Sequence, residues 1–115
     1  MILVNDSTVQ FTATFDEPTK NADNTSLADL KNHTVWVKVG VQPAASVATV
    51  AASGLSGGQK ISTTILVPAS INQITTFDAW VTSSDLTGNT SLPSTHVTVT
   101  VDRIGPLAPT NFLLA

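Results

Sequence analysis

Two histidines and eight acidic residues are the side chains whose types could carry acid–base catalysis or bind a metal ion. His33 lies in phase with Val35 and Val37 in an alternating run, so we expect it in or beside a core rather than as a ligand or base. His96 is out of phase with Val97 and is expected to face solvent. Two separated histidines without any cysteine do not make a zinc site. Because no nucleophile can be paired with a base, we expect a protein that is not an enzyme.

Six acidic residues fall in loops or at strand ends, where a hard cation is conceivable: Asp16, Glu17, Asp23, Asp29, Asp85 and Asp102. Their spacing lacks the dense acidic pattern that Ca²⁺ requires. The favoured interpretation is that they cap turns through their own side chains. In particular, Asp85, Gly88 and Asn89 are expected to shape a turn that reverses the chain. We therefore expect no metal and no cofactor.

Composition narrows the classes of function. A chain of 115 residues forms one domain with one core. Only 11% of the residues are charged and the net charge is −3, so nucleic acid is not an expected partner. The absence of cysteine excludes disulfides and thiolate sites. The apolar runs are far shorter than the roughly 20 residues of a membrane helix, and the first residues do not resemble a signal peptide, so no membrane insertion is expected.

Alternation of apolar and polar residues predicts the strands. The clearest runs cover 8–15, 33–39, 77–83 and 97–101, and weaker ones cover 47–51 and 61–67. Leu27 and Leu30 are expected to plug one end of the core, and Ile71 and Ile74 to cap it. With no helical period, about seven short strands predict an all-β protein, a Greek-key sandwich of two antiparallel sheets.

Three blocks carry a resemblance to a known family: residues 8–15, the segment PTKNADNTSLADLKNHTVWVKVG, and residues 76–94 with the valine strand that follows. The chain resembles a fibronectin type III domain of the bacterial and phage type. The middle block is similar to the family's Asn-x-Asp-Gly-Thr-x-Leu and Leu-x-x-Tyr-x-Val-x-Tyr patterns. The last block is similar to its Ala-x-Asp-x-x-Gly-Asn-x-Ser-x-Pro-Ser run. The resemblance implies a fibronectin type III or immunoglobulin-like sandwich over residues 1–104, and it says almost nothing about activity.

Several positions depart from the family pattern. Ala13 stands where the family usually has Trp, and Phe15 is expected to fill part of that space. Phe77 replaces the corner tyrosine, and His33 replaces a tyrosine of the third strand. The usual first strand is reduced to residues 2–5, which leaves the first edge of the sheet thin.

Two tryptophans are the first feature that favours a binding role. Trp36 and Trp80 lie on the faces opposite the inward valines, and the resemblance implies that their strands pair. The indoles are therefore expected to lie near one another on an exposed face. Either they form a contact patch for a protein or a sugar, or they are a cross-strand pair that stabilises the sheet, and both interpretations stay open.

The second feature is the Pro-containing tail of residues 105–115, GPLAPTNFLLA, in which two prolines prevent the last strand from continuing. We expect its last residues, with Phe112, Leu113 and Leu114, to dock on a neighbouring subunit or another protein, pairing with the thin first edge. The same pattern resembles the Pro-x-x-Pro start of a following family member. The alternatives are that the chain belongs to a repeat array, or that the tail folds back on its own domain.

The sequence therefore predicts a non-enzymatic structural or interaction module whose partners are other protein subunits. The favoured setting is a phage virion, in which the protein would be a head decoration, collar or tail-associated component. The initiating Met, the absence of an export signal and of cysteine, the size and the apolar terminus favour this setting. The alternative is a spacer, or an adhesion or carbohydrate-binding module, of a secreted or cell-surface bacterial protein, where a surface glycan becomes a partner.

Overall fold

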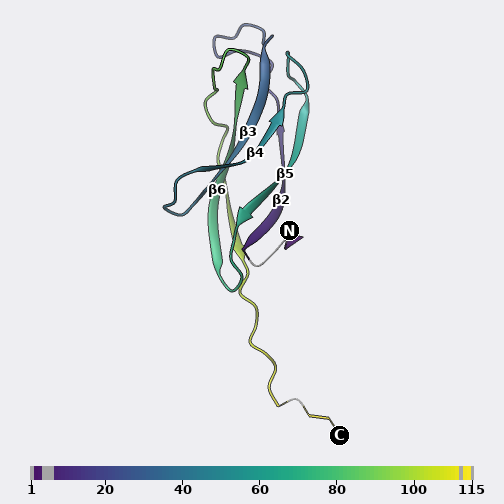
Figure 1. The fold of residues 1–115 in the computed structure, drawn as a ribbon, viewed down its shortest axis with the longest axis vertical. Coiled ribbons are helices and arrows are strands. Elements are labelled where there is room, and N and C mark those ends of the chain that lie inside the picture. Colours follow the sequence, from purple (N-terminus) through teal and green to yellow (C-terminus); the bar gives the residue numbers. More distant parts are fainter. Residues whose placement is uncertain (1, 4–6, 112, 115) are drawn as a thin grey trace.

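The described part of the chain, residues 2–3, 7–111 and 113–114 of a computed structural model, consists of strands and their connections and contains no helix (Figure 1). The strands are β1 (Ile2–Leu3), β2 (Thr8–Asp16), β3 (Leu30–Val39), β4 (Ala45–Ala51), β5 (Lys60–Pro68), β6 (Ile74–Asp85) and β7 (Val97–Asp102). A three-stranded sheet has the order β1-β2-β5, and a four-stranded sheet has the order β4-β3-β6-β7. All neighbours are antiparallel, which confirms the predicted all-β, two-sheet class. No helix of the described residues is long and apolar enough to cross a membrane.

The core lies between the two sheets and is made of alternate residues of the strands, as the period of two predicts. Its buried members are Val9, Ile65, Val67 and Ala69 from the first sheet and its end, and Val35, Val37, Phe77 and Val101 from the second. The rings of Phe11 and Phe77 meet edge to face across the layers, with centroids 5.6 Å apart. Each of the Val, Ile and Phe side chains in this set stabilises the fold by about 1.5–3 kcal/mol when fully buried.

One end of the core differs from the sequence prediction. Ile71 and Ile74 do not cap it, because their side chains are 47% and 57% exposed. Ile74 is out of phase with Phe77 in β6, so it falls on the outer face of the sheet. Ala69, only 2% exposed, closes this end instead.

The opposite end is closed by the segment between β2 and β3 together with the start of β3, where Leu27 and Leu30 respectively are buried as predicted. A tight approach holds this segment against the loop between β4 and β5. Gly57 has φ +63°, and a Cβ at this position would lie 2.2 Å from the carbonyl oxygen of Pro18. Only glycine fits both the backbone conformation and the space.

One long edge of the sandwich is only partly covered. Among the described residues, β1 pairs with β2 through Ile2 with Gln10 and Leu3 with Val9. β2 continues to Asp16 with β5 on its other side. Within the described residues, positions 11–16 of β2 therefore have no strand on the β1 side, so the prediction of a thin first edge holds there. Residues 4 and 5 of the predicted first strand lie outside the described residues.

Beyond β7 the chain leaves the sandwich (Figure 1). Arg103 anchors the exit: its side chain donates to the carbonyl of Ala69, and its amide donates to the carbonyl of Gln73 at 3.0 Å. Leu107, Leu113 and Leu114 are then 95%, 87% and 85% exposed. The described residues of the tail thus extend away rather than fold back, and Phe112 lies outside the described residues.

Candidate functional site

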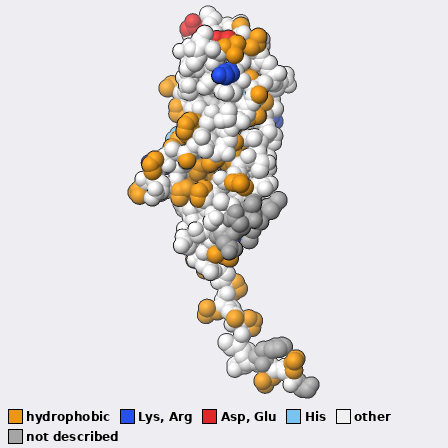
Figure 2. Space-filling view, in the orientation of Figure 1, with side chains coloured by type: hydrophobic (Ala, Val, Ile, Leu, Met, Phe, Trp, Pro, Cys, Tyr) orange, Lys and Arg blue, Asp and Glu red, His pale blue; other side chains and the backbone are white. Residues whose placement is uncertain are grey.

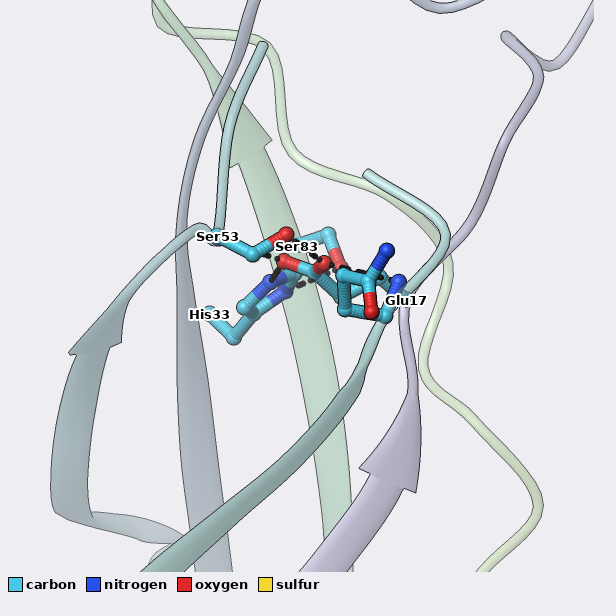
Figure 3. Close-up of polar contacts among 5 residues, drawn as sticks. Glu17, His33, Ser53 and Ser83 are labelled. Atoms are coloured by element: carbon cyan, nitrogen blue, oxygen red, sulfur yellow. Dashed lines mark hydrogen bonds and ion pairs between the residues drawn. The ribbon is translucent and has the colours of Figure 1, made fainter. Parts of the chain in front are cut away.

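A buried polar cluster lies at the end of the sandwich where β2 stops and β3 begins (Figure 3). His33 of β3 is fully buried, and its Nδ1 lies 2.8 Å from the hydroxyl of Ser83 in β6. Its Nε2 lies 2.8 Å from Oε2 of Glu17, the residue after β2. The ring of Phe15 packs edge-on against the imidazole, with centroids 5.0 Å apart. Three segments far apart in sequence therefore meet on one imidazole, and the prediction that His33 belongs to the core is confirmed.

Glu17 is the acceptor that organises this cluster. Besides its bond to His33, it accepts from the amide and hydroxyl of Ser53 and from the amide of Gln59, the two amide bonds measuring 3.0 and 3.1 Å. Burial opposes ionisation of Glu17, but the hydrogen bonds from Ser53, His33 and Gln59 outweigh it and lower its pKa to about 2. The ionised carboxylate therefore ties the segment between β4 and β5 to the end of β2.

The order Ser83, His33, Glu17 has the connectivity of a nucleophile, a base and an orienting carboxylate. Since an ionised carboxylate only accepts, Nε2 of His33 carries a proton, and in the neutral ring Nδ1 accepts the hydroxyl proton of Ser83. The expectation that no nucleophile meets a base thus misses this hydrogen-bonded pair. The side chains of His33 and Glu17 are nevertheless 0% exposed.

A small cleft of about 170 Å³ adjoins the cluster, and Ser83, Asp85 and Asn89 are among its lining residues. Ser83 is also held within the sheet edge, because its amide donates to the hydroxyl of Ser91 at 2.9 Å and its carbonyl accepts from the amide of Ser91 at 2.8 Å. The arrangement joins four chain segments through satisfied polar groups, and that is the role its geometry fits best.

Sequence reasoning missed Glu17 although a signal was present. The inward positions of β2 are odd-numbered, and Glu17 continues the series of Phe11, Ala13 and Phe15 by one step. A charged residue in phase with a buried face demands a partner. His33, in phase with the inward valines of β3, is that partner.

Asp23 and Asp85 behave as the predicted turn caps. Asp85 Oδ1 accepts from the amides of Thr87 and Asn89 at 3.0 and 2.9 Å, and the bond from Asn89 leads the interactions that lower the pKa of Asp85. Asp23 accepts from the hydroxyl and amide of Thr25 at 2.6 and 3.1 Å, and these bonds lower its pKa. In the described part of the chain, no three His, Cys, Asp or Glu side chains are grouped so that they could hold a metal ion.

The two tryptophans are direct cross-strand partners in β3 and β6, so the expected proximity is observed. The indole nitrogen of Trp36 donates to the hydroxyl of Thr82 at 3.0 Å. The ring of Trp80 stacks on His96, with centroids 4.3 Å apart and planes 9° from parallel. His96 is exposed, as predicted, whereas both indoles are half-buried. A binding role for Trp36 and Trp80 stays a prediction.

A mostly apolar groove of about 650 Å³ opens between the two sheets. Its walls include Phe11, Ala13 and Phe15 of β2 on one side and Ala79, Val81, Val97 and Val99 of β6 and β7 on the other. The sequence places Val97 in the inward set, but its side chain is 59% exposed. The groove therefore lies along the stretch of β2 that has no neighbouring strand on the β1 side in the described part of the chain.

Comparison of the chain with protein-family models, curated proteins and solved structures finds no match. The fibronectin type III assignment therefore stays an interpretation of the three sequence blocks.

Proposed function

We propose that this protein is a non-enzymatic structural module that works through contacts with other protein subunits. The observation that carries the proposal is the uncovered apolar surface on an otherwise closed sandwich. The groove of about 650 Å³ exposes the walls of the core, and Leu107, Leu113 and Leu114 are almost fully exposed on the tail. Apolar surface left in water on a domain this small is typical of a surface that another protein covers.

A Greek-key fold of the fibronectin type III kind is part of this proposal. The three-plus-four strand order supports it, as does the pairing of β3 with β6, which the resemblance implies. Phe77 at the position of the corner tyrosine is buried with 3% exposure, so a ring without a hydroxyl fits there.

The setting that we propose is a phage virion, with the protein as a head decoration, collar or tail-associated component. The cysteine-free, weakly charged composition and the apolar end of the chain support it. The alternative setting is a spacer or adhesion module of a secreted or cell-surface bacterial protein. A specific observation favours that alternative: the tail leaves the sandwich in line with its long axis (Figure 1), as a connection to a following domain would. Trp36 and Trp80 are then the surface that we assign to a glycan.

Fractionation of the native source with an antibody against the full chain tests the proposal. Co-sedimentation with particles that contain capsid or tail proteins supports the virion setting, and recovery with the cell envelope supports the alternative. Chain recovered only as free monomer overturns the assembly role. A panel of ester and glycan substrates tests the negative statement on catalysis. Turnover that is lost in Ser83→Ala but kept in the neighbouring control Ser84→Ala would make the protein a hydrolase.

A further inference from the structure

We propose that the groove beside β2 accepts the C-terminal residues 111–115 of a second copy of this chain as an added antiparallel strand. The inference deepens the proposed function, on which it rests, by naming the partner and the two surfaces that meet. The acceptor is the part of β2 from Phe11 to Asp16, and the donor is the sequence Asn-Phe-Leu-Leu-Ala.

The acceptor offers both the backbone and the side-chain features of an incomplete sheet. In an antiparallel pair half of the backbone N–H and C=O groups point away from the partner strand, so residues 11–16 of β2 present such groups on the side opposite β5. Below this edge, Phe11, Ala13 and Phe15 face into the groove. Ala13 is the smallest of the three side chains, so it leaves room beside it for a larger side chain.

The donor matches this acceptor in length and composition. Five residues of a strand span about 17 Å, and the six residues of the acceptor span about 20 Å. Pro106 and Pro109 precede the donor, so every one of its residues has an N–H to offer to the ladder. The donor carries no charged side chain, so Phe112 and Leu114 can enter an apolar groove without burying a side-chain charge.

One pairing register places alternate side chains of the donor in the groove. If Leu113 lies opposite Thr14, then Phe112 lies opposite Phe15 and Leu114 lies opposite Ala13, and residues directly opposite share a face of the sheet. Phe112 and Leu114 would then enter the groove while Leu113 faces outward. The donor runs in the same direction as β1 and ends opposite Thr12, two residues before the Ile2–Gln10 pair, so both strands fit along one edge.

The donor comes from a second copy because a chain's own tail leaves at the wrong end. The amide of Ala69 donates to the carbonyl of Ser7 at 2.9 Å, and Arg103 donates to the carbonyl of Ala69, so the tail starts where β2 starts. β1 covers the adjoining residues of β2 at that end. Along the exposed tail, apolar side chains point into solvent away from the body (Figure 2). Each copy would thus offer its tail to the next, a head-to-tail contact that propagates.

The first test measures self-association of the full chain by sedimentation velocity over a range of concentrations. Leu114→Asp should weaken association at least tenfold, because a carboxylate would enter the apolar groove. Leu113→Asp is the matched control with the same change of composition, and it should stay within about threefold of the wild type because this position faces outward. Equal effects of the two variants, or a monomeric wild type at all concentrations, would overturn the proposal.

A second test uses the absence of native cysteine. In the double variant Thr14→Cys/Leu113→Cys, both thiols lie on the outward face of the proposed added strand. Oxidation should give a ladder of disulfide-linked dimers and higher species on a non-reducing gel. A monomer with an internal disulfide, or one with no disulfide at all, contradicts donation by a second copy.

Different results would contradict the tail exchange and the proposed function. A wild-type chain that stays monomeric yet co-sediments with native particles removes the tail exchange and leaves the proposed function standing. A chain that self-associates through Leu114 but is free of any assembly in its native source keeps the exchange and removes the proposed function.

Discussion

The Glu17 cluster makes a prediction whose size follows from the structure. Glu17→Gln removes the charge of a carboxylate that accepts bonds from His33, Ser53 and Gln59. One of the two carboxylate oxygens becomes an NH₂ group, which donates and therefore faces a donor. The pKa of Glu17 is lowered from 4.5 to about 2 in the folded protein. At 1.36 kcal/mol per unit, the ionised form stabilises the fold by about 3 kcal/mol at neutral pH.

The same linkage gives the pH dependence and its sign. Because the folded-state pKa is lowered, the stabilisation is complete above the unfolded value of 4.5 and is lost as the pH falls toward 2. At pH 3 about 2 of the 3 kcal/mol have gone from the wild type. Glu17→Gln has nothing to titrate, so it should be about 3 kcal/mol less stable than the wild type at pH 7 and only about 1 kcal/mol less stable at pH 3. Other acids titrate in both proteins and cancel in the difference.

Urea unfolding followed by tryptophan fluorescence measures both gaps, since the chain has two Trp and no Tyr. Asp16→Asn is the matched control: Asp16 adjoins Glu17, but its ion pair with Lys60 is exposed, with side chains 77% and 69% accessible. Such a pair contributes at most about 1 kcal/mol. A Glu17→Gln gap below about 0.5 kcal/mol at pH 7 would refute the structural role of the cluster, given the values expected for buried charged hydrogen bonds. A gap of equal size at both pH values would assign the loss to packing rather than charge.

Two further substitutions test the surroundings. Gly57→Ala should lower the free energy of unfolding by more than about 2 kcal/mol, because the new Cβ would lie 2.2 Å from the carbonyl oxygen of Pro18 and φ at this position is +63°. Gly54→Ala is the control: no atom lies within 4 Å of its Cβ position, so its free energy of unfolding should stay within about 0.5 kcal/mol of the wild type. Equal urea midpoints for the two variants would contradict the close approach of Gly57 to Pro18. His96→Ala should shift the fluorescence emission of Trp80 to longer wavelength, because the ring face that His96 covers becomes exposed to water. The free energy of unfolding should fall by no more than about 1.5 kcal/mol. An unchanged emission spectrum would show that the stacked imidazole does not shield the indole.

The sheet architecture was accessible from the sequence because burial on one face leaves a period of two in each strand. That period correctly placed Val35 and Phe77 inside and Trp36 and Trp80 on the opposite faces, whereas the pairing of the two tryptophan strands was implied by the family resemblance alone. The prediction failed at the ends of strands, because the alternation decides which face a side chain takes but does not show where the strand begins or ends. Ile74 is as apolar as the buried residues near it. It is nevertheless 57% exposed, because it lies an odd number of residues from Phe77 and so faces the opposite side of the sheet.

The polar cluster was accessible only in part. The alternation in each strand predicts that Glu17 and His33 both face inward. Whether these two side chains contact each other depends on how the two sheets stack. Ser53 lies 36 residues from Glu17, and Ser83 lies 50 residues from His33. The chain contains many other serine and threonine side chains. Local spacing carries no information about such distant contacts, so the sequence could not select these serines from the others.

The inward positions of β2, which line the groove, change character along the strand. Val9 is fully buried and Glu17 is satisfied by hydrogen bonds, but Phe11, Ala13 and Phe15 between them are only half-buried. Natural sheets protect such an edge with charges, prolines or bulges. β4, the edge of the other sheet, pairs across a register shift at Val35/Trp36, whereas β2 pairs with β5 in one continuous register.

Residues 11–15 of β2 also carry no charge and no proline, so nothing in this stretch blocks the addition of a strand. An edge that carries no charge from residue 11 to residue 15, above an open apolar groove, favours the addition of another strand. Among the described residues, those of the tail form an uncharged apolar segment that extends into solvent along the long axis, which supports the proposed pairing of the tail with this edge.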